Sequence, residues 1–228
     1  MYKNLYKPQI KICGITDIDQ AVKIADLGVD AIGFVFYPAS KRNIAPDKAK
    51  KIIQRLPLDI CNVGVFVNES FDFIMDKQKY CNLDAVQLHG NESEELVLKL
   101  KKKGLNVIKA LYLNDSPSIC DAKKYSASSY LIEHCKGKLP GGNALDWDWE
   151  KARDFGNNFA FILAGGLNSD NIQNAFKSSI PDAIDVSSGV EIKKGVKDIV
   201  KVKDFLLNLE NCVANIDFNK TRNLRKVF

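Results

Sequence analysis

Two side chains with acid–base chemistry stand at the ends of apolar, strand-like runs. Cys13 ends the run at residues 9–13, and Glu133 follows the run at residues 129–132. A thiolate can remove a proton from carbon, and a carboxyl group shielded from water can donate one. A buried packing cysteine and an exposed carboxylate are the alternative interpretations. If the fold places the two groups on opposite sides of one ligand, they favour a proton-shifting isomerase.

Glycine-rich segments follow two later apolar runs and indicate a site for an anion. They contain Gly165, Gly166 and Asn168 in the first segment, and Ser187, Ser188 and Gly189 in the second. Glycine lets backbone N–H groups approach a ligand closely, and helix N-termini favour anions. Tight turns alone would explain either segment, but the two together predict a phosphate site held by backbone amides.

Further polar residues near the strand ends are candidates for substrate contacts. They are Arg42, Gln87, His89 and Asp185. An arginine can bind a carboxylate through two parallel hydrogen bonds, although a solvated loop charge is the alternative for Arg42. His89 can contact substrate or be a hydrogen-bonded structural histidine. Because the chain has only two histidines, a multi-histidine metal site is excluded.

Eight apolar runs, alternating with amphipathic stretches, determine where these residues lie. The runs cover residues 9–13, 31–36, 61–67, 85–88, 107–113, 129–132, 159–164 and 183–186. Several are apolar on both faces, which is typical of parallel strands covered on both sides. Eight strand–helix units predict a single (β/α)₈ or TIM barrel over residues 1–210. A doubly wound open sheet is the alternative, but it would have fewer strands and often a glycine-rich first turn.

Composition and charge narrow the classes of function. The 228 residues are 46% hydrophobic and 27% charged, as in ordinary globular proteins. The net charge is +5, but the segment after Asp217 is basic without acids, so we expect no nucleic-acid partner. No cysteine pair has C-x-x-C spacing, and free cysteines suit the reducing cytoplasm that we expect for this protein. No apolar run approaches the roughly 20 residues of a membrane span, so we expect no membrane partner. Residues 211–228 lack periodicity and are expected to form a poorly ordered tail, with a segment docked on the barrel as the alternative.

The chain as a whole resembles the phosphoribosylanthranilate isomerases of tryptophan biosynthesis. The matching segments are residues 11–16, 33–42, 63–68, 86–90, 140–143, 147–149, 164–168, 185–191 and 195–198. The resemblance implies a (β/α)₈ barrel that binds a phosphosugar–anthranilate substrate and needs no metal or redox cofactor. The implied reaction is the Amadori rearrangement of N-(5-phospho-β-D-ribosyl)anthranilate to 1-(2-carboxyphenylamino)-1-deoxy-D-ribulose 5-phosphate.

The resemblance also implies roles for individual residues. Cys13 would be the general base that removes the proton on ribose C2, and Glu133 the general acid that opens the sugar ring. Arg42 would bind the anthranilate carboxylate. The family usually has aspartate at the position of Glu133, and the extra methylene moves the carboxyl by roughly 1.5 Å. Either the following loop compensates, or the enzyme is slow, or Asp185 supplies the proton instead.

Two other functions fit parts of the pattern. A related isomerase acting on the histidine-pathway aminoaldose phosphate would need a second phosphate loop near strands two to four, where the sequence has no glycine-rich candidate. A non-catalytic phosphosugar-binding barrel would bind a substrate analogue without turnover, with Glu133 as the mark of lost chemistry. Either a monomer or a homodimer is compatible with the sequence.

Overall fold

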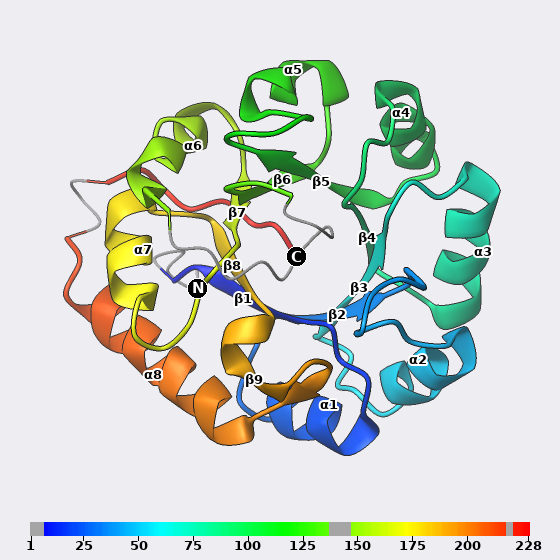
Figure 1. Cartoon of the computed structure of the whole chain (residues 1–228), viewed down its shortest axis with the longest axis horizontal. Helices are drawn as coiled ribbons and strands as arrows, with labels where there is room; N and C mark the ends of the chain where they lie inside the picture. The colour runs from blue at the N-terminus through cyan, green and yellow to red at the C-terminus, as the bar shows by residue number, and fades with distance from the viewer. Residues whose placement is uncertain (1–6, 137–146, 218–220) are drawn as a thin grey trace.

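The computed structural model forms a closed barrel of eight parallel strands surrounded by helices (Figure 1). It describes residues 7–136, 147–217 and 221–228; the matching segment at residues 140–143 lies outside these ranges. The strands are β1 (Gln9–Cys13), β2 (Ala31–Val35), β3 (Cys61–Phe66), β4 (Ala85–Leu88), β5 (Asn106–Tyr112), β6 (Ser129–Glu133), β7 (Phe161–Leu163) and β8 (Ala183–Val186). They follow chain order, and β8 closes the barrel against β1. The prediction of a (β/α)₈ barrel is confirmed.

Helices of different lengths cover the outside of the barrel. They are α1 (Ile18–Ala25), α2 (Pro46–Ile53), α3 (Phe71–Cys81), α4 (Glu94–Lys102), α5 (Ala122–Tyr125), α6 (Phe155–Asn158), α7 (Ile172–Ser179) and α8 (Ile199–Ala214). Side chains of Asp17, Ser70, Ser93 and Asp198 accept hydrogen bonds from the first turns of α1, α3, α4 and α8, which fixes where these helices begin. Among the described residues, no helix is both long and apolar enough to cross a membrane.

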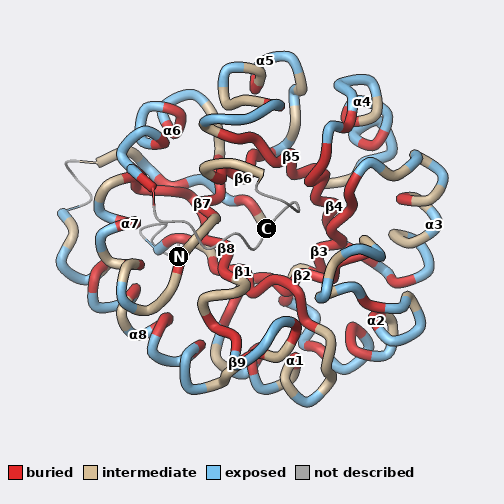
Figure 2. Tube along the Cα trace, viewed as in Figure 1, coloured by how far each residue is buried: buried red, intermediate tan, exposed pale blue. Residues whose placement is uncertain are grey.

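The strands are buried on both faces, which explains their continuous apolar sequences (Figure 2). Successive side chains of a strand point to opposite faces, so alternate residues face the helices or the barrel axis. Ile32 and Phe34 of β2 belong to the large core that includes helix residues, whereas Ala31 belongs to a separate cluster with Val63. This alternation decides which strand residues can reach a ligand at the barrel mouth.

A short hairpin after β8 adds to the eight strand–helix units. A 3₁₀ turn, η3 (Ser188–Val190), leads into two antiparallel strands, β9 (Glu191–Lys193) and β10 (Val196–Lys197). Gly195 joins them with a φ of 84°, in the left-handed region that favours glycine. The hairpin brings Glu191 and Lys197 back toward the end of β8.

The C-terminal segment differs from the expectation of a poorly ordered tail. Helix α8 passes residue 210 and ends at Ala214, and residues 221–228 pack against the barrel, with Leu224 and Val227 buried. Val227 joins the apolar cluster of the barrel interior, and Gln9 Oε1 accepts hydrogen bonds from the N–H groups of Val227 and Phe228 at 2.6 and 3.0 Å. The expectation was wrong because two apolar residues among basic ones have no periodicity, yet they fit a gap that only the closed barrel creates.

Deletion of residues 221–228 is expected to lower the thermal midpoint by about 5–10 °C and to leave kcat nearly unchanged. Burial of a leucine and a valine contributes about 3 kcal/mol or more, and each kcal/mol is about 2–4 °C for a chain of this size. The deletion also removes Arg222, whose Nη1 lies 2.8 Å from Oδ1 of the buried Asp182. Circular dichroism melting tests this, with Lys226→Gln as a control that removes one charge and no buried apolar side chain. An unchanged midpoint would show that the segment does not stabilise the fold.

Candidate active site

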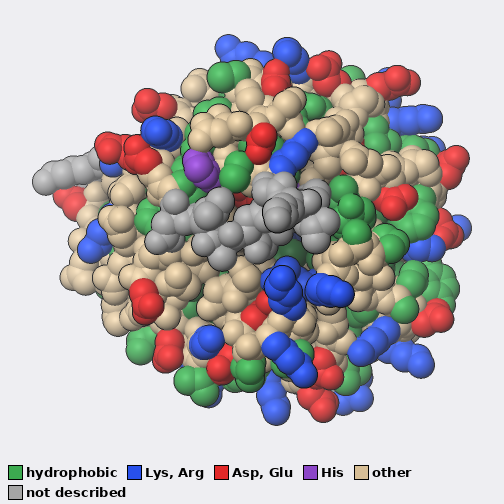
Figure 3. Space-filling model, viewed as in Figure 1, with side chains coloured by type: hydrophobic (Ala, Val, Ile, Leu, Met, Phe, Trp, Pro, Cys, Tyr) green, Lys and Arg blue, Asp and Glu red, His purple; other side chains and the backbone are tan. Residues whose placement is uncertain are grey.

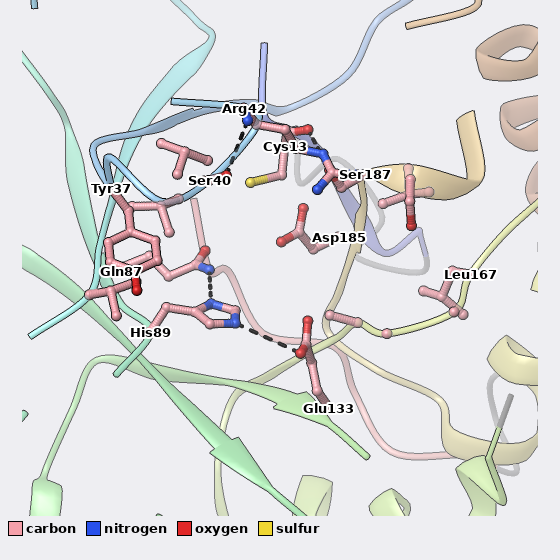
Figure 4. Close-up of a pocket in the computed structure, with 18 residues that line it drawn as sticks. Cys13, Tyr37, Ser40, Arg42, Gln87, His89, Glu133, Leu167, Asp185 and Ser187 are labelled. Carbon is pink, nitrogen blue, oxygen red and sulfur yellow. Dashed lines mark hydrogen bonds and ion pairs between the residues drawn. The ribbon is translucent and has the colours of Figure 1, made fainter. Parts of the chain in front are cut away.

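Inward-facing residues at the carboxyl ends of the strands form one pocket (Figure 4). Ten of the twelve predicted site residues line it: Cys13, Arg42, Gln87, His89, Glu133, Gly165, Gly166, Asp185, Ser187 and Ser188. The empty space of the pocket, including part of the solvent at its mouth, is about 690 Å³. Cys13 and Glu133 lie on opposite sides of it in Figure 4. Closure of the barrel therefore places a thiol and a carboxyl group against one ligand-sized space.

The Cys13 thiol is held in a narrow place at the end of β1. A Cβ atom on Gly33 of the neighbouring strand would lie 2.7 Å from the Cys13 sulfur, so glycine is needed there to leave room for it. Burial raises the pKa of the Cys13 thiol above its ordinary value, and the cations Lys11 and Lys197 oppose this rise only in part. Burial therefore favours the protonated thiol, and the base must be generated before it can act.

Asp185 lies beneath Cys13 in a buried ion pair. Its Oδ2 accepts a hydrogen bond from Lys11 Nζ at 2.7 Å, and the Lys11 side chain has no exposed surface. Although burial opposes the charge on Lys11, Asp185 keeps the lysine pKa above its ordinary value. Within the described chain, the buried Oδ1 of Asp185 has no hydrogen-bond partner. Since Asp185 lines the pocket, this oxygen can accept a hydrogen bond from a ligand hydroxyl.

Gln87, His89 and Glu133 form a line across the other side of the pocket (Figure 4). Gln87 Nε2 lies 2.8 Å from His89 Nδ1, and His89 Nε2 lies 3.7 Å from Glu133 Oε2. With the Gln87 amide donating to Nδ1, the imidazole carries its proton on Nε2, the nitrogen that faces Glu133. That nitrogen has no hydrogen-bond partner in the described residues. His89 can therefore donate to Glu133 or to a ligand atom between the two groups.

Gly165, Gly166, Ser187 and Ser188 line the pocket in the loops after β7 and β8. Gly165 and Gly166 have φ angles of 85° and 73°, which allow the backbone to turn toward the ligand. Basic side chains gather near the centre of the face seen in Figure 3, which favours an anionic ligand there.

Two residues of the predicted phosphate site do not line the pocket. Asn168 uses Oδ1 to accept hydrogen bonds from the N–H groups of Asp170 and Asn171, at the start of the segment that leads into α7. Gly189 lies against the preceding loop, and a Cβ there would be 1.9 Å from the carbonyl oxygen of Leu167. The Asn168 side chain and the tight packing of Gly189 shape these two loops, and a phosphate contact of either residue stays a prediction.

Arg42 lies at the pocket wall and shares a carboxylate partner with Lys197, a contact that the sequence analysis missed. Its Nε and Nη2 each donate to a carboxylate oxygen of Glu191 at 2.8 Å. Lys197 Nζ donates to the same carboxylate at 2.8 Å. Glu191 and Lys197 were missed because they follow the eighth strand and have no periodic pattern. The sequence feature that could have identified them is their position in the last segments that match the family, at residues 185–191 and 195–198.

Comparisons with known proteins show the family to which the chain belongs. A family model described as N-(5'phosphoribosyl)anthranilate (PRA) isomerase matches residues 10–208. The N-(5'-phosphoribosyl)anthranilate isomerase of Desulfatibacillum aliphaticivorans is 47% identical over 220 residues, which cover 96% of this chain and 98% of the relative. The crystal structure of phosphoribosyl anthranilate isomerase from Thermotoga maritima has a TM-score of 0.83 and 38% identity, and the match covers 90% of this chain and 99% of that one. The chain therefore belongs to the N-(5'-phosphoribosyl)anthranilate isomerase family.

Proposed function

We propose that this chain catalyses the Amadori rearrangement of N-(5-phospho-β-D-ribosyl)anthranilate to 1-(2-carboxyphenylamino)-1-deoxy-D-ribulose 5-phosphate, a step of L-tryptophan biosynthesis. The observation that carries the proposal is the placement of Cys13 and Glu133 on opposite sides of one pocket. A structurally similar phosphoribosyl anthranilate isomerase, with a TM-score of 0.80, is in complex with reduced 1-(o-carboxyphenylamino)-1-deoxyribulose 5-phosphate. That ligand carries the phosphate and the carboxylate that this pocket is suited to bind.

The two charged ends of the substrate are assigned to different walls of the pocket. Ser187 and Ser188, with the glycines of the loop after β7, hold the phosphate through backbone N–H groups. Arg42 binds the anthranilate carboxylate. Part of the pocket lining is apolar, with Val35 and Val65 among its residues, and suits the aromatic ring. A ligand bound in this way has its ribose between Cys13 and Glu133.

Glu133 is the general acid of the first step. Its carboxyl group donates a proton to the ring oxygen of the ribose while the bond between C1 and that oxygen breaks, and the bonding electrons go to the oxygen. The lone pair of the anthranilate nitrogen forms a C=N bond to C1, which gives a Schiff base. The Nε2–H of His89 then stabilises the Glu133 carboxylate that remains.

Cys13 is the general base of the second step. Its thiolate removes the proton on C2, and the C–H electrons form a C1=C2 bond while the C=N electrons return to nitrogen. The enolamine formed in this way tautomerises to the ketone. Lys11, buried beside the sulfur, stabilises the thiolate before the proton is taken.

The rate is expected to rise with pH through neutrality because burial raises the pKa of the Cys13 thiol. Only the thiolate is a base, so below this pKa its fraction increases close to tenfold per pH unit, and kcat/KM follows it as long as the general acid Glu133 keeps its proton. A profile of kcat/KM between about pH 6.5 and 9 tests this, since kcat/KM reports groups of the free enzyme. The same profile of Glu133→Gln, which has no carboxyl group to lose a proton, isolates the thiol, and a plateau below pH 7 in that variant would contradict the raised pKa of Cys13.

Loss of fluorescence of freshly made phosphoribosylanthranilate, followed with and without the purified protein, tests the proposed function. A decay faster than the spontaneous one, absent from the Cys13→Ala variant, supports the isomerase. A folded protein that binds the reduced analogue without accelerating the decay would indicate a binding barrel instead. Turnover of the histidine-pathway aminoaldose phosphate alone would indicate the related isomerase.

The cellular setting and the oligomeric state belong to the same proposal. All six cysteines are free, which suits the reducing cytoplasm that we propose for this chain. We propose either a monomer or a homodimer; a phosphoribosylanthranilate isomerase from Thermotoga maritima is described as dimeric. Sedimentation of the purified chain distinguishes the two states.

A further inference from the structure

One buried carboxylate, Glu191, joins two cations that serve different parts of the pocket. Its Oε1 accepts hydrogen bonds from Arg42 Nε and Lys197 Nζ, both at 2.8 Å, and its Oε2 accepts one from Arg42 Nη2 at 2.8 Å. The side chain is only 5% exposed. Although burial alone would raise it, the pKa of Glu191 is lowered by Arg42 and Lys197, so the carboxylate stays charged.

The contact with Glu191 sets the orientation of Arg42. Two parallel hydrogen bonds fix the plane of the guanidinium group, which a single contact would leave free to rotate. The stem of Arg42 also passes close to the loop after β1, since a Cβ on Gly14 would lie 2.5 Å from Arg42 Cδ. Arg42 is thus held from both sides, and its place at the pocket wall follows from the position of Glu191.

The contact with Lys197 extends this arrangement to the phosphate loop. Lys197 Nζ donates to the backbone oxygen of Ser187 at 3.0 Å and to Ser187 Oγ at 3.2 Å. Ser187 Oγ in turn donates to the backbone oxygen of Cys13 at 3.0 Å. A continuous set of contacts therefore runs from Arg42 through Glu191 and Lys197 to Ser187, and ends beside the catalytic base.

We propose that Glu191 is a positioning residue that sets the spacing between Arg42 and the phosphate loop at Ser187, and with it the place of the substrate's C2 next to Cys13. The inference rests on the function proposed above. The hairpin of β9 and β10 carries both Glu191 and Lys197, so its role is to hold the two anion-binding walls at one distance. A ligand that spans both walls depends on this spacing, whereas a ligand that occupies one wall does not.

The charges of these three side chains allow an experiment that separates a positioning role of Glu191 from an electrostatic one. Arg42, Lys197 and Glu191 together carry one net positive charge, so replacing Glu191 by glutamine adds one more. A purely electrostatic role therefore predicts that Glu191→Gln binds every anion more tightly. Positioning predicts that the spanning ligand loses affinity relative to a small anion, because its two ends no longer fit at once.

Calorimetry of wild type and Glu191→Gln with two probes separates these outcomes. For reduced 1-(o-carboxyphenylamino)-1-deoxyribulose 5-phosphate we expect Kd to rise about tenfold, while Kd for inorganic phosphate is unchanged or falls. A change of Kd by the same factor for both probes would overturn the proposal. Glu210→Gln is the matched control, because Glu210 is exposed and contacts Lys7 on the outer surface. This measurement needs no turnover, so an inactive wild type would overturn the proposed function without affecting the result for Glu191.

Kinetics of the same variants give a second readout. Glu191→Gln is expected to lower kcat by about 10–100-fold, since a displacement near 1 Å can cost on the order of a hundredfold. Glu191→Asp keeps the charge but shortens the side chain, so positioning predicts a lower kcat there too, whereas electrostatics predicts the wild-type value. If Glu191→Gln fails to fold, the double variant Glu191→Gln/Lys197→Met removes the unpaired cation. Wild-type kcat in that folded double variant would overturn the proposal.

Discussion

The Cys13→Ala variant is expected to fold and to show no turnover of phosphoribosylanthranilate above the spontaneous rate. General bases contribute about 10²–10⁴ to rate, and alanine has no group that can take the proton from C2. In the barrel, the thiol is the inward-facing side chain at the end of β1, opposite Glu133 (Figure 4). Lys11 cannot replace it, because Lys11 is ion-paired to Asp185 and fully buried.

Fluorescence decay measured with equal amounts of wild type, Cys13→Ala and Cys61→Ala tests this expectation. Cys61 begins β3 at the other end of the barrel, and burial raises the pKa of its thiol to about 12, so the same substitution there should leave kcat unchanged. Melting curves of the variants check the fold. Wild-type activity in folded Cys13→Ala would remove Cys13 from the mechanism.

The second large effect is expected for Glu133→Gln, with kcat lowered by about 10²–10⁴. Glutamine has nearly the same shape as glutamate but no proton to give to the ring oxygen. Binding should change little, because the amide still fits beside His89. Asp185, the alternative acid in the sequence analysis, already uses Oδ2 to accept a hydrogen bond from Lys11 at 2.7 Å.

Two further variants show whether proton donation is the cause of the loss. Glu133→Asp keeps an acidic proton at the position where the family usually has aspartate, so we expect it to be at least about tenfold more active than Glu133→Gln. Glu95→Gln makes the same chemical change on the exposed surface of α4 and should match wild type. If kcat of Glu133→Gln stays near wild type, the acid is another group and Asp185 becomes the first candidate.

The barrel could be predicted because its strands carry a local signal. Residues 32–36 and 63–67 are apolar without alternation, which is typical of strands covered on both faces, and eight strand-like runs leave few other topologies. Cys13 and Glu133 could be chosen because each ends such a run. The roles of Asn168 and Gly189 could not be predicted in the same way, because a loop sequence does not show which of its atoms face a ligand and which hold the loop itself.

The sequence by itself determined the order of the elements, the end of the barrel at which the polar residues lie, and the chemical types available there. These follow from local periodicity and from the two-residue alternation of strands. Only the tertiary structure decided that Glu191 holds Arg42, that Lys11 pairs with Asp185, and that Val227 packs into the barrel interior. The partners in these contacts are 149, 174 and, for the hydrogen bond between Val227 and Gln9, 218 residues apart in the chain. Contacts over such separations leave no local pattern, because they depend on closure of the whole barrel.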